Sequence, residues 1–262
     1  MRIIVLAKQV PEPDKIKIDR NSGTIGRVGV PSMLNPDDAN AMEAALELKD
    51  NYPDTTVSVV SMGPKQAMST LRECLAMGAD DAYLISSPAF GGADTCATSK
   101  TLAAAVKKLG DFDFIFAGRQ STDGDTAQVG PQTAQRLGVP SVTYVQKIRE
   151  IKQDTIIVER ALEDGYEVIE VEKPCLMTVI KELNTPRYMS VIKIEDAYNE
   201  DITVWNEHSL RIDPKNAGIK ASPTQVLRVF IPPPKGAGEM LSGSVPEMAA
   251  ELVAKLTDKH IL

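Results

Sequence analysis

Blocks of apolar residues alternate with amphipathic segments over the first half of the chain. Runs of aliphatic and aromatic residues at 2–7, 56–62, 82–85 and 112–117 predict buried strands. Apolar residues at helical spacing follow each run. This β-α-β-α rhythm predicts an α/β fold with a doubly wound parallel sheet and right-handed crossovers.

The pattern changes in two places. Residues 15–25 alternate polar and apolar positions around a turn at 21–23, which predicts a small hairpin. After Pro140, short alternating segments predict an antiparallel meander, at residues 141–145, 155–160 and 166–171. Residues 175–180 then form a further apolar run and predict one more buried strand.

Regular patterns become rare beyond residue 181. Prolines and an acidic stretch at 195–201 interrupt the chain, and only residues 245–256 have helical periodicity there. A long irregular segment without its own core is best explained by contact with a partner. We therefore expect an α/β domain over residues 1–190, antiparallel from about residue 141, and a C-terminal partner-wrapping arm over residues 191–262.

The segment after the fourth apolar run is the main candidate site. Residues 118–134 (GRQSTDGDTAQVGPQTA) are mostly polar and small, and they lead into a helix predicted at residues 134–137. Ligands bind at the carboxyl ends of strands in open α/β sheets, where amides of small residues can approach a phosphate. We assign the anion to the amides of residues 126–130, with Gly130 leaving room for a pyrophosphate, and give Asp123 and Asp125 capping, loop-fixing or ribose-binding roles. The alternative is a polar turn with one helix cap.

A second candidate lies at residues 35–38 (NPDD), near the end of the first predicted strand. Asn35 can cap a helix, Pro36 suits the first helical position, and two acids suit the positive first turn. Capping alone explains these residues. The functional alternative is that they also contact the ribose or base of a ligand.

Composition narrows the functional classes. The net charge of −7 and the small number of aromatic residues (one Trp, six Tyr and five Phe) argue against nucleic-acid binding. The three cysteines lack C-x-x-C spacing, which argues against a disulfide framework or thiolate metal site. No apolar run approaches the roughly twenty residues of a membrane span. We expect a soluble cytoplasmic protein that does not contact a membrane.

Several catalytic motifs are missing from the sequence. The two histidines, His208 and His260, lie in the irregular C-terminal region, and G-x-S-x-G, G-x-G-x-x-G and P-loop motifs are absent. We therefore expect no catalytic side chain and no metal site. The residues themselves predict a nucleotide-binding α/β domain with a partner, without fixing the reaction.

Several segments together resemble the beta subunit of electron transfer flavoproteins. They are residues 7–11 (AKQVP), 35–38, 123–131 (DGDTAQVGP), 183–188 (LNTPRY) and 222–226 (SPTQV), and the resemblance covers nearly the whole chain. It implies a Rossmann-like fold of the adenine nucleotide α-hydrolase type. It also implies a heterodimer with a larger alpha subunit that carries an electron-shuttling FAD.

The resemblance implies a nucleotide or flavin site at residues carried over from the family. Some members hold a structural AMP there, whereas electron-bifurcating members of anaerobes hold a second FAD that oxidises NADH. Residues 35–38, 91–95 and 118–120 resemble the bifurcating type more, so we expect FAD, with AMP as the alternative. The implied cofactor-binding residues are Ala7, Asn35, Pro36, Asp37, Asp38, Met62, Gly118, Arg119, Gln120, Asp123, Gly124, Asp125, Thr126, Ala127, Gln128, Val129, Gly130, Thr133 and Ala134.

The family also implies partners. Residues 183–190 resemble the loop that docks onto a dehydrogenase, in which Leu183 would be the exposed anchor. The alternative is an ordinary turn. The implied docking residues are Leu183, Asn184, Pro186, Arg187 and Tyr188. Expected partners are the alpha subunit, a flavin-containing dehydrogenase of acyl-CoA or hydroxy-acid type, and ferredoxin or flavodoxin. The competing functions are an ATP-using hydrolase or ligase of the α-hydrolase type and a stress-type nucleotide-binding protein.

Overall fold

The computed structural model describes residues 1–12, 17–18, 25–26, 31–227 and 236–262. The chain divides into two compact units, Met1–Leu227 and Arg228–Leu262. Residues 191–227, which the sequence placed in the C-terminal arm, therefore pack within the first unit. That the C-terminal region wraps a partner stays a prediction.

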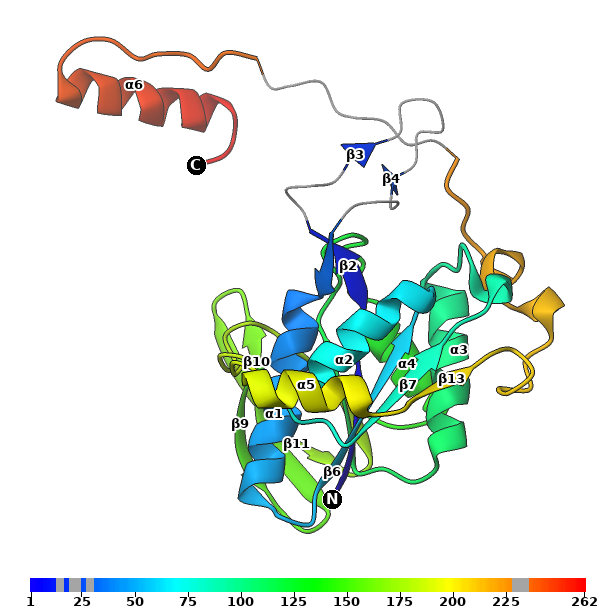
Figure 1. The fold of residues 1–262 in the computed structure, drawn as a ribbon. Coiled ribbons are helices and arrows are strands. Elements are labelled where there is room, and N and C mark those ends of the chain that lie inside the picture. Colours follow the sequence, from blue (N-terminus) through cyan, green and yellow to red (C-terminus); the bar gives the residue numbers. More distant parts are fainter. Residues whose placement is uncertain (13–16, 19–24, 27–30, 228–235) are drawn as a thin grey trace. The chain divides into compact units, whose positions relative to one another are not determined.

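One nine-stranded sheet forms the frame of the first unit, in the order β11-β10-β9-β12-β8-β1-β6-β7-β13 (Figure 1). From β9 to β13 in this order, each strand runs parallel to its neighbours. Strand β10 runs antiparallel to both β9 and β11. The predicted α/β fold with a large parallel sheet is confirmed. The strands are β1 (Arg2–Leu6), β6 (Thr56–Met62), β7 (Asp81–Ile85), β8 (Phe114–Gly118), β9 (Ser141–Ile151), β10 (Thr155–Leu162), β11 (Gly165–Glu172), β12 (Cys175–Val179) and β13 (Ile202–Trp205).

Two short strand pairs lie outside this sheet. Strand β2 (Gln9–Pro11) pairs with β5 (Ser32–Leu34), and β3 (Lys17–Ile18) pairs antiparallel with β4 (Ile25–Gly26). The second pair confirms the predicted hairpin. Its predicted turn at residues 21–23 lies outside the described residues.

Helices cover both faces of the sheet. Because side chains of a strand alternate, Ile3 and Val5 join one core, whereas Ile4 and Leu6 join the other. Helices α1 (Pro36–Asn51), α2 (Met68–Met77) and α5 (Val191–Asn199) contribute to the first core, and α3 (Thr95–Leu109) and α4 (Val129–Leu137) to the second (Figure 1). The short 3-10 helices are η2 (Lys65–Ala67), η3 (Pro88–Phe90), η4 (Pro214–Asn216) and η5 (Gly218–Ala221).

The strand order reverses beside β1. From β1 the chain proceeds to β6 and β7 on one side, and then it returns to β8 on the other side. The carboxyl ends of β1 and β8 are therefore neighbours at a topological switch point, where ligands of doubly wound sheets bind. The segment that follows β8 is the loop of residues 118–130. The predicted stretch extended to residue 134, but α4 begins at Val129, five residues before the predicted start of the helix.

Helix α5 and strand β13 were not predicted from the sequence. Helix α5 buries only Ala197, and its other apolar side chains are largely exposed. Its apolar residues therefore do not mark the face that packs against the protein. Strand β13 has four residues and pairs with β7 at the edge of the sheet. Both elements are held by neighbours distant in sequence, which a local pattern does not reveal.

The second unit contains the predicted C-terminal helix, α6 (Val245–Asp258). Ser244 and Glu247 form a capping box at its start, and none of its residues is buried. Among the helices of the described residues, none combines the length and the apolar character needed to cross a membrane.

Candidate functional site

Asp38, in the first turn of α1, joins the ends of two neighbouring strands. Its Oδ2 accepts a hydrogen bond from the Lys8 amide at 2.8 Å, and its Oδ1 accepts one from the Gly118 amide at 2.9 Å. Burial raises the pKa of Asp38 to about 7, although both amides lower it. The carboxylate therefore holds β1 and β8 together at the switch point.

Asn35 fixes the next part of the loop. It occupies the N-cap position of α1, but its side chain makes no capping hydrogen bond, so the predicted capping role is wrong. Instead its Nδ2 donates to the Gln120 carbonyl at 2.8 Å, and its Oδ1 accepts from the Thr122 amide at 3.1 Å. Asn35 is completely buried. Its side chain therefore anchors the loop after β8 to the start of α1.

Lys8, which lies just after the neighbouring strand β1, holds the loop through its side chain. Its Nζ donates to Asp123 Oδ1 at 2.5 Å and to Ser121 Oγ at 3.1 Å. The Asp123 side chain is 4% exposed, whereas that of Lys8 is 43% exposed. The Asp123 carboxylate thus faces inward, in the loop-fixing role we expected, and the Lys8 ammonium lies at the mouth of the site.

The amides of residues 126–130 donate no hydrogen bond within the described residues. Asp125 and Ala127 have positive φ angles of 54° and 52°, and Gln128 returns to the right-handed region. Neighbouring left-handed and right-handed residues are the backbone conformation in which successive N–H groups can converge on an anion. Helix α4 begins here without a side-chain cap, so its first-turn amides and its dipole add to the same positive potential.

Arg119 and Asp37 lie at the edge of this loop. Their Nε and Oδ2 atoms are 3.4 Å apart, and the guanidinium lies 5.8 Å from the ring centroid of Tyr144. Both atoms are buried and have no hydrogen-bond partner within the described residues. Burial raises the pKa of Asp37, and Arg119 lowers it. The two atoms form an ion pair with each other, which partly compensates for the missing hydrogen bonds.

Together these groups fit an adenine nucleotide or a flavin nucleotide. The free amides and Lys8 suit a phosphate or pyrophosphate, and the Arg119–Asp37 pair suits a polar ring or ribose. Other predicted cofactor residues lie in the loop or near the strand ends. Ala7 follows β1, Met62 ends β6, and Gln120 donates a hydrogen bond to Asp125. Pro36, Gly124 and Thr126 are exposed.

Three predicted cofactor residues instead face the interior. Thr133 and Ala134 are buried in α4, and the Thr133 hydroxyl donates to the Val129 carbonyl at 2.7 Å. A Cβ atom at Gly130 would lie 2.5 Å from Thr178 Cγ2. Glycine at 130 is therefore required by the packing of α4 on β12, and the expectation that it leaves room for a pyrophosphate is wrong. Its amide still belongs to the anion-binding row.

Lys8 and Thr95 were not among the predicted cofactor-binding residues, although they lie in segments 7–11 and 91–95, which carry the family resemblance. Thr95, at the start of α3, donates to Gln128 Oε1 at 2.9 Å and so joins the α3 N-terminus to the loop. Lys8 was detectable because it directly follows the first strand. The contact of Thr95 depends on the packing of α3 beside α4, which no local signal indicates.

The predicted docking segment lies on the outer side of α1. Leu183 is half-buried against the first core, so the expectation that it is an exposed anchor is wrong. Asn184 and Arg187 hydrogen-bond to α1, and Pro186 is half-buried. Tyr188 is fully exposed. Of the predicted docking residues, Tyr188 is the one with a free side chain.

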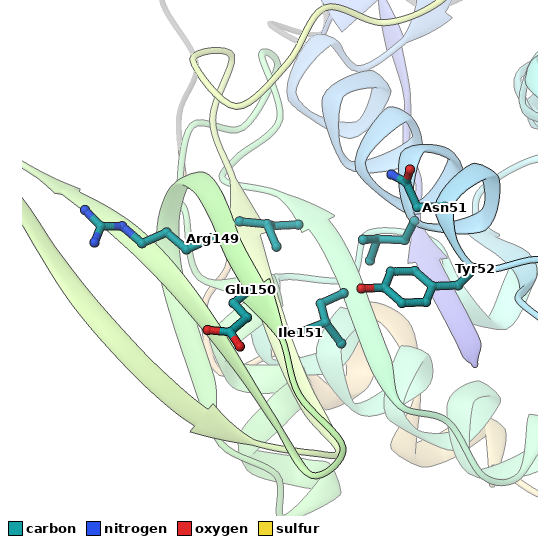
Figure 2. A pocket seen from close by; sticks show the side chains of 7 residues that line it. Asn51, Tyr52, Arg149, Glu150 and Ile151 are labelled. Atoms are coloured by element: carbon teal, nitrogen blue, oxygen red, sulfur yellow. The ribbon is translucent and has the colours of Figure 1, made fainter.

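A separate hollow of about 350 Å³ lies at the opposite end of α1. Figure 2 shows the Tyr52 ring pointing toward Ile151 of β9, with Asn51 above and Arg149 and Glu150 to one side. This hollow is open, is lined by the end of α1 and the last residues of β9, and includes no residue of the loop after β8. We do not assign it to the nucleotide.

Known proteins resemble this chain over its full length. The family model described as "Electron transfer flavoprotein domain" matches residues 22–210. The subunit CarD of the caffeyl-CoA reductase-Etf complex of Acetobacterium woodii is 60% identical over 100% of both chains. The electron transfer flavoprotein subunit beta of Clostridium acetobutylicum is 53% identical, and the acryloyl-CoA reductase electron transfer subunit gamma of Anaerotignum propionicum is 45% identical, each over 100% of both chains.

Proposed function

We propose that this chain, which belongs to the electron transfer flavoprotein family, is the small subunit of a heterodimeric flavoprotein and binds FAD at the strand ends. The observation that carries this proposal is the row of free amides at residues 126–130, beside the Lys8 ammonium. Backbone N–H groups at a helix N-terminus are suited to the pyrophosphate of a dinucleotide. The similarity to the subunit CarD of a caffeyl-CoA reductase-Etf complex supports FAD over AMP as the ligand.

A bound FAD would accept hydride from NADH and supply one-electron chemistry toward ferredoxin or flavodoxin and, through the alpha-subunit FAD, toward a dehydrogenase. The residues of this chain position the cofactor. Asn35 and Asp38 hold the loop, Lys8 and the amides offset the phosphate charge, and Arg119 places a cation at the edge. The alternative is a subunit that holds AMP as a structural ligand on the same amides and does not bifurcate electrons.

The functional test is NADH-dependent ferredoxin reduction by the purified heterodimer. We expect ferredoxin to be reduced only while a dehydrogenase accepts electrons at the same time. NADH oxidation with an artificial acceptor should persist without ferredoxin. No ferredoxin reduction with any acceptor present would favour the AMP alternative and leave the family assignment intact.

The alpha subunit is the proposed partner of the second unit. Helix α6 exposes Val245, Leu252 and Val253 by 75%, 48% and 53%, and the unit buries no residue of this helix. Residues of this type are normally covered in a stable assembly. The proposed arm therefore begins after residue 227, and residues 236–262 are its described part.

The dehydrogenase is the proposed partner of residues 183–190. Two relatives bear the names of reductase complexes, which supports a partner of the flavin dehydrogenase class for this chain. Tyr188, fully exposed beside Val191 and Ile192 of α5, is the proposed contact. Aromatic side chains of this kind often dominate the free energy of binding.

Tyr188→Ala is expected to weaken binding of the dehydrogenase about tenfold without lowering the free energy of unfolding, because an exposed ring contributes little to the fold. Surface plasmon resonance and urea unfolding of the heterodimer measure the two quantities. Tyr52→Ala, at an exposed tyrosine near the far end of α1, is the control and should retain affinity. Equal affinity of Tyr188→Ala and wild type would rule out this contact.

A further inference from the structure

Helix α1 contacts both segments that the proposed function uses. Its first turn anchors the loop after β8 through Asn35 and Asp38. Its middle anchors residues 183–190 through Asn40 and Glu43. Two segments that are far apart in the sequence are thus attached to one rigid element. The distance between the cofactor loop and the docking segment is therefore set by α1.

The strongest attachment joins Glu43 to Arg187. The Glu43 carboxylate accepts hydrogen bonds from the Arg187 amide at 3.0 Å, from its Nε at 2.9 Å and from its Nη2 at 2.9 Å. Arg187 also donates to Asp50 Oδ2 at 2.8 Å. The side chain of Glu43 is 6% exposed, against 62% for Asp50. A bidentate pair in such a covered position fixes orientation as well as position.

Asn40 provides a second attachment. Its Nδ2 donates to the Asn184 carbonyl at 2.9 Å, and Asn184 Nδ2 donates in return to the Asn40 carbonyl at 3.1 Å. Leu183 adds an apolar contact with the first core. The segment is therefore held at Leu183, Asn184 and Arg187, and the fully exposed Tyr188 follows directly.

We infer that Glu43 is a positioning residue for the docking of the dehydrogenase: by fixing Arg187 from α1, it holds Tyr188 outward at a set distance from the cofactor loop. This inference rests on the docking role proposed above for residues 183–190. The Glu43 carboxylate is covered, so its influence on a partner acts through Arg187. Glu43 also raises the pKa of Arg187, which keeps the guanidinium charged.

The test compares Glu43→Gln with Glu47→Gln in the purified heterodimer. Both changes remove one carboxylate from α1, but the Glu47 side chain is exposed. Hydrogen exchange should become about tenfold faster at the Arg187 amide in Glu43→Gln, because its hydrogen bond to the Glu43 carboxylate is weakened. Affinity for the dehydrogenase that the wild-type heterodimer reduces should fall about tenfold, since the segment must be ordered on binding. Glu47→Gln should match wild type in both assays, and cofactor content should be equal in all three proteins.

A second variant addresses the charge of Arg187, which in Glu43→Gln is paired with Asp50 alone. Glu43→Gln/Arg187→Gln contains two neutral partners, and we expect the same faster exchange and weaker binding from it. Unchanged exchange in both variants would overturn the role of Glu43 even if the segment does bind the dehydrogenase. Faster exchange with unchanged affinity would instead overturn the docking role of residues 183–190, and the inference with it.

Discussion

Gly118→Ala is expected to lower the free energy of unfolding of the heterodimer by about 3 kcal/mol or more and to release the cofactor. A Cβ atom at this position would lie 2.4 Å from Asp38 Oδ1, 2.7 Å from Asp37 Cβ and 2.8 Å from the Asp37 carbonyl carbon. Because one of these atoms belongs to the backbone of α1, a side-chain rotation cannot relieve the contact. The start of α1 must move away from β8.

That movement also breaks the hydrogen bond between Asp38 and the Gly118 amide, and it pulls Asn35 away from the loop. Urea unfolding and the FAD released on denaturation measure the two effects. Gly124→Ala is the matched control in the same loop, because the nearest neighbour of its Cβ would be Ser121 Oγ at 3.3 Å, the end of a side chain that can rotate away. Wild-type stability and cofactor content in Gly118→Ala would show that α1 does not depend on this contact.

Gly130→Ala is expected to lower the free energy of unfolding by about 2 kcal/mol, because its Cβ would lie 2.5 Å from Thr178 Cγ2 on β12. The better helix propensity of alanine offsets at most about 1 kcal/mol of this cost. The first turn of α4 should shift outward, and FAD content should fall with it. Urea unfolding and the FAD released on denaturation again report the two effects.

Thr178→Ser provides a sharp control, because it removes the clashing methyl group and keeps the hydroxyl that accepts from the Tyr144 amide. In the Thr178→Ser background, Gly130→Ala should be neutral or stabilising. A double-mutant cycle isolates this interaction. Additive effects of the two changes would mean that Gly130 is required for a reason other than packing on β12.

The fold was predictable because its signals are local. The continuous apolar runs at residues 2–7 and 112–117 indicate strands covered on both faces, and the alternating segments after Pro140 indicate the antiparallel part. The alternation of predicted strands and helices also indicates the position of the loop at residues 118–130. Strand β13 and helix α5 were missed because long-range packing, not local pattern, stabilises them.

The direction of individual side chains was not predictable. Asn35 matches the preference for a helix cap, yet its amide reaches across to the loop after β8. The family motif predicts that Leu183 is an exposed docking anchor, yet its side chain packs on the core. Both outcomes depend on which neighbour the fold brings close. The sequence contains the residue types of the site but not their partners.

We propose that the loop at residues 118–130 holds FAD in this subunit. The most direct measurement is the nucleotide released when the heterodimer, purified without added nucleotide, is denatured and its cofactors are separated and quantified. One FAD belongs to the proposed alpha subunit. We therefore expect two FAD per heterodimer in wild type and about one in Gly118→Ala. One FAD and one AMP per wild-type heterodimer would contradict it.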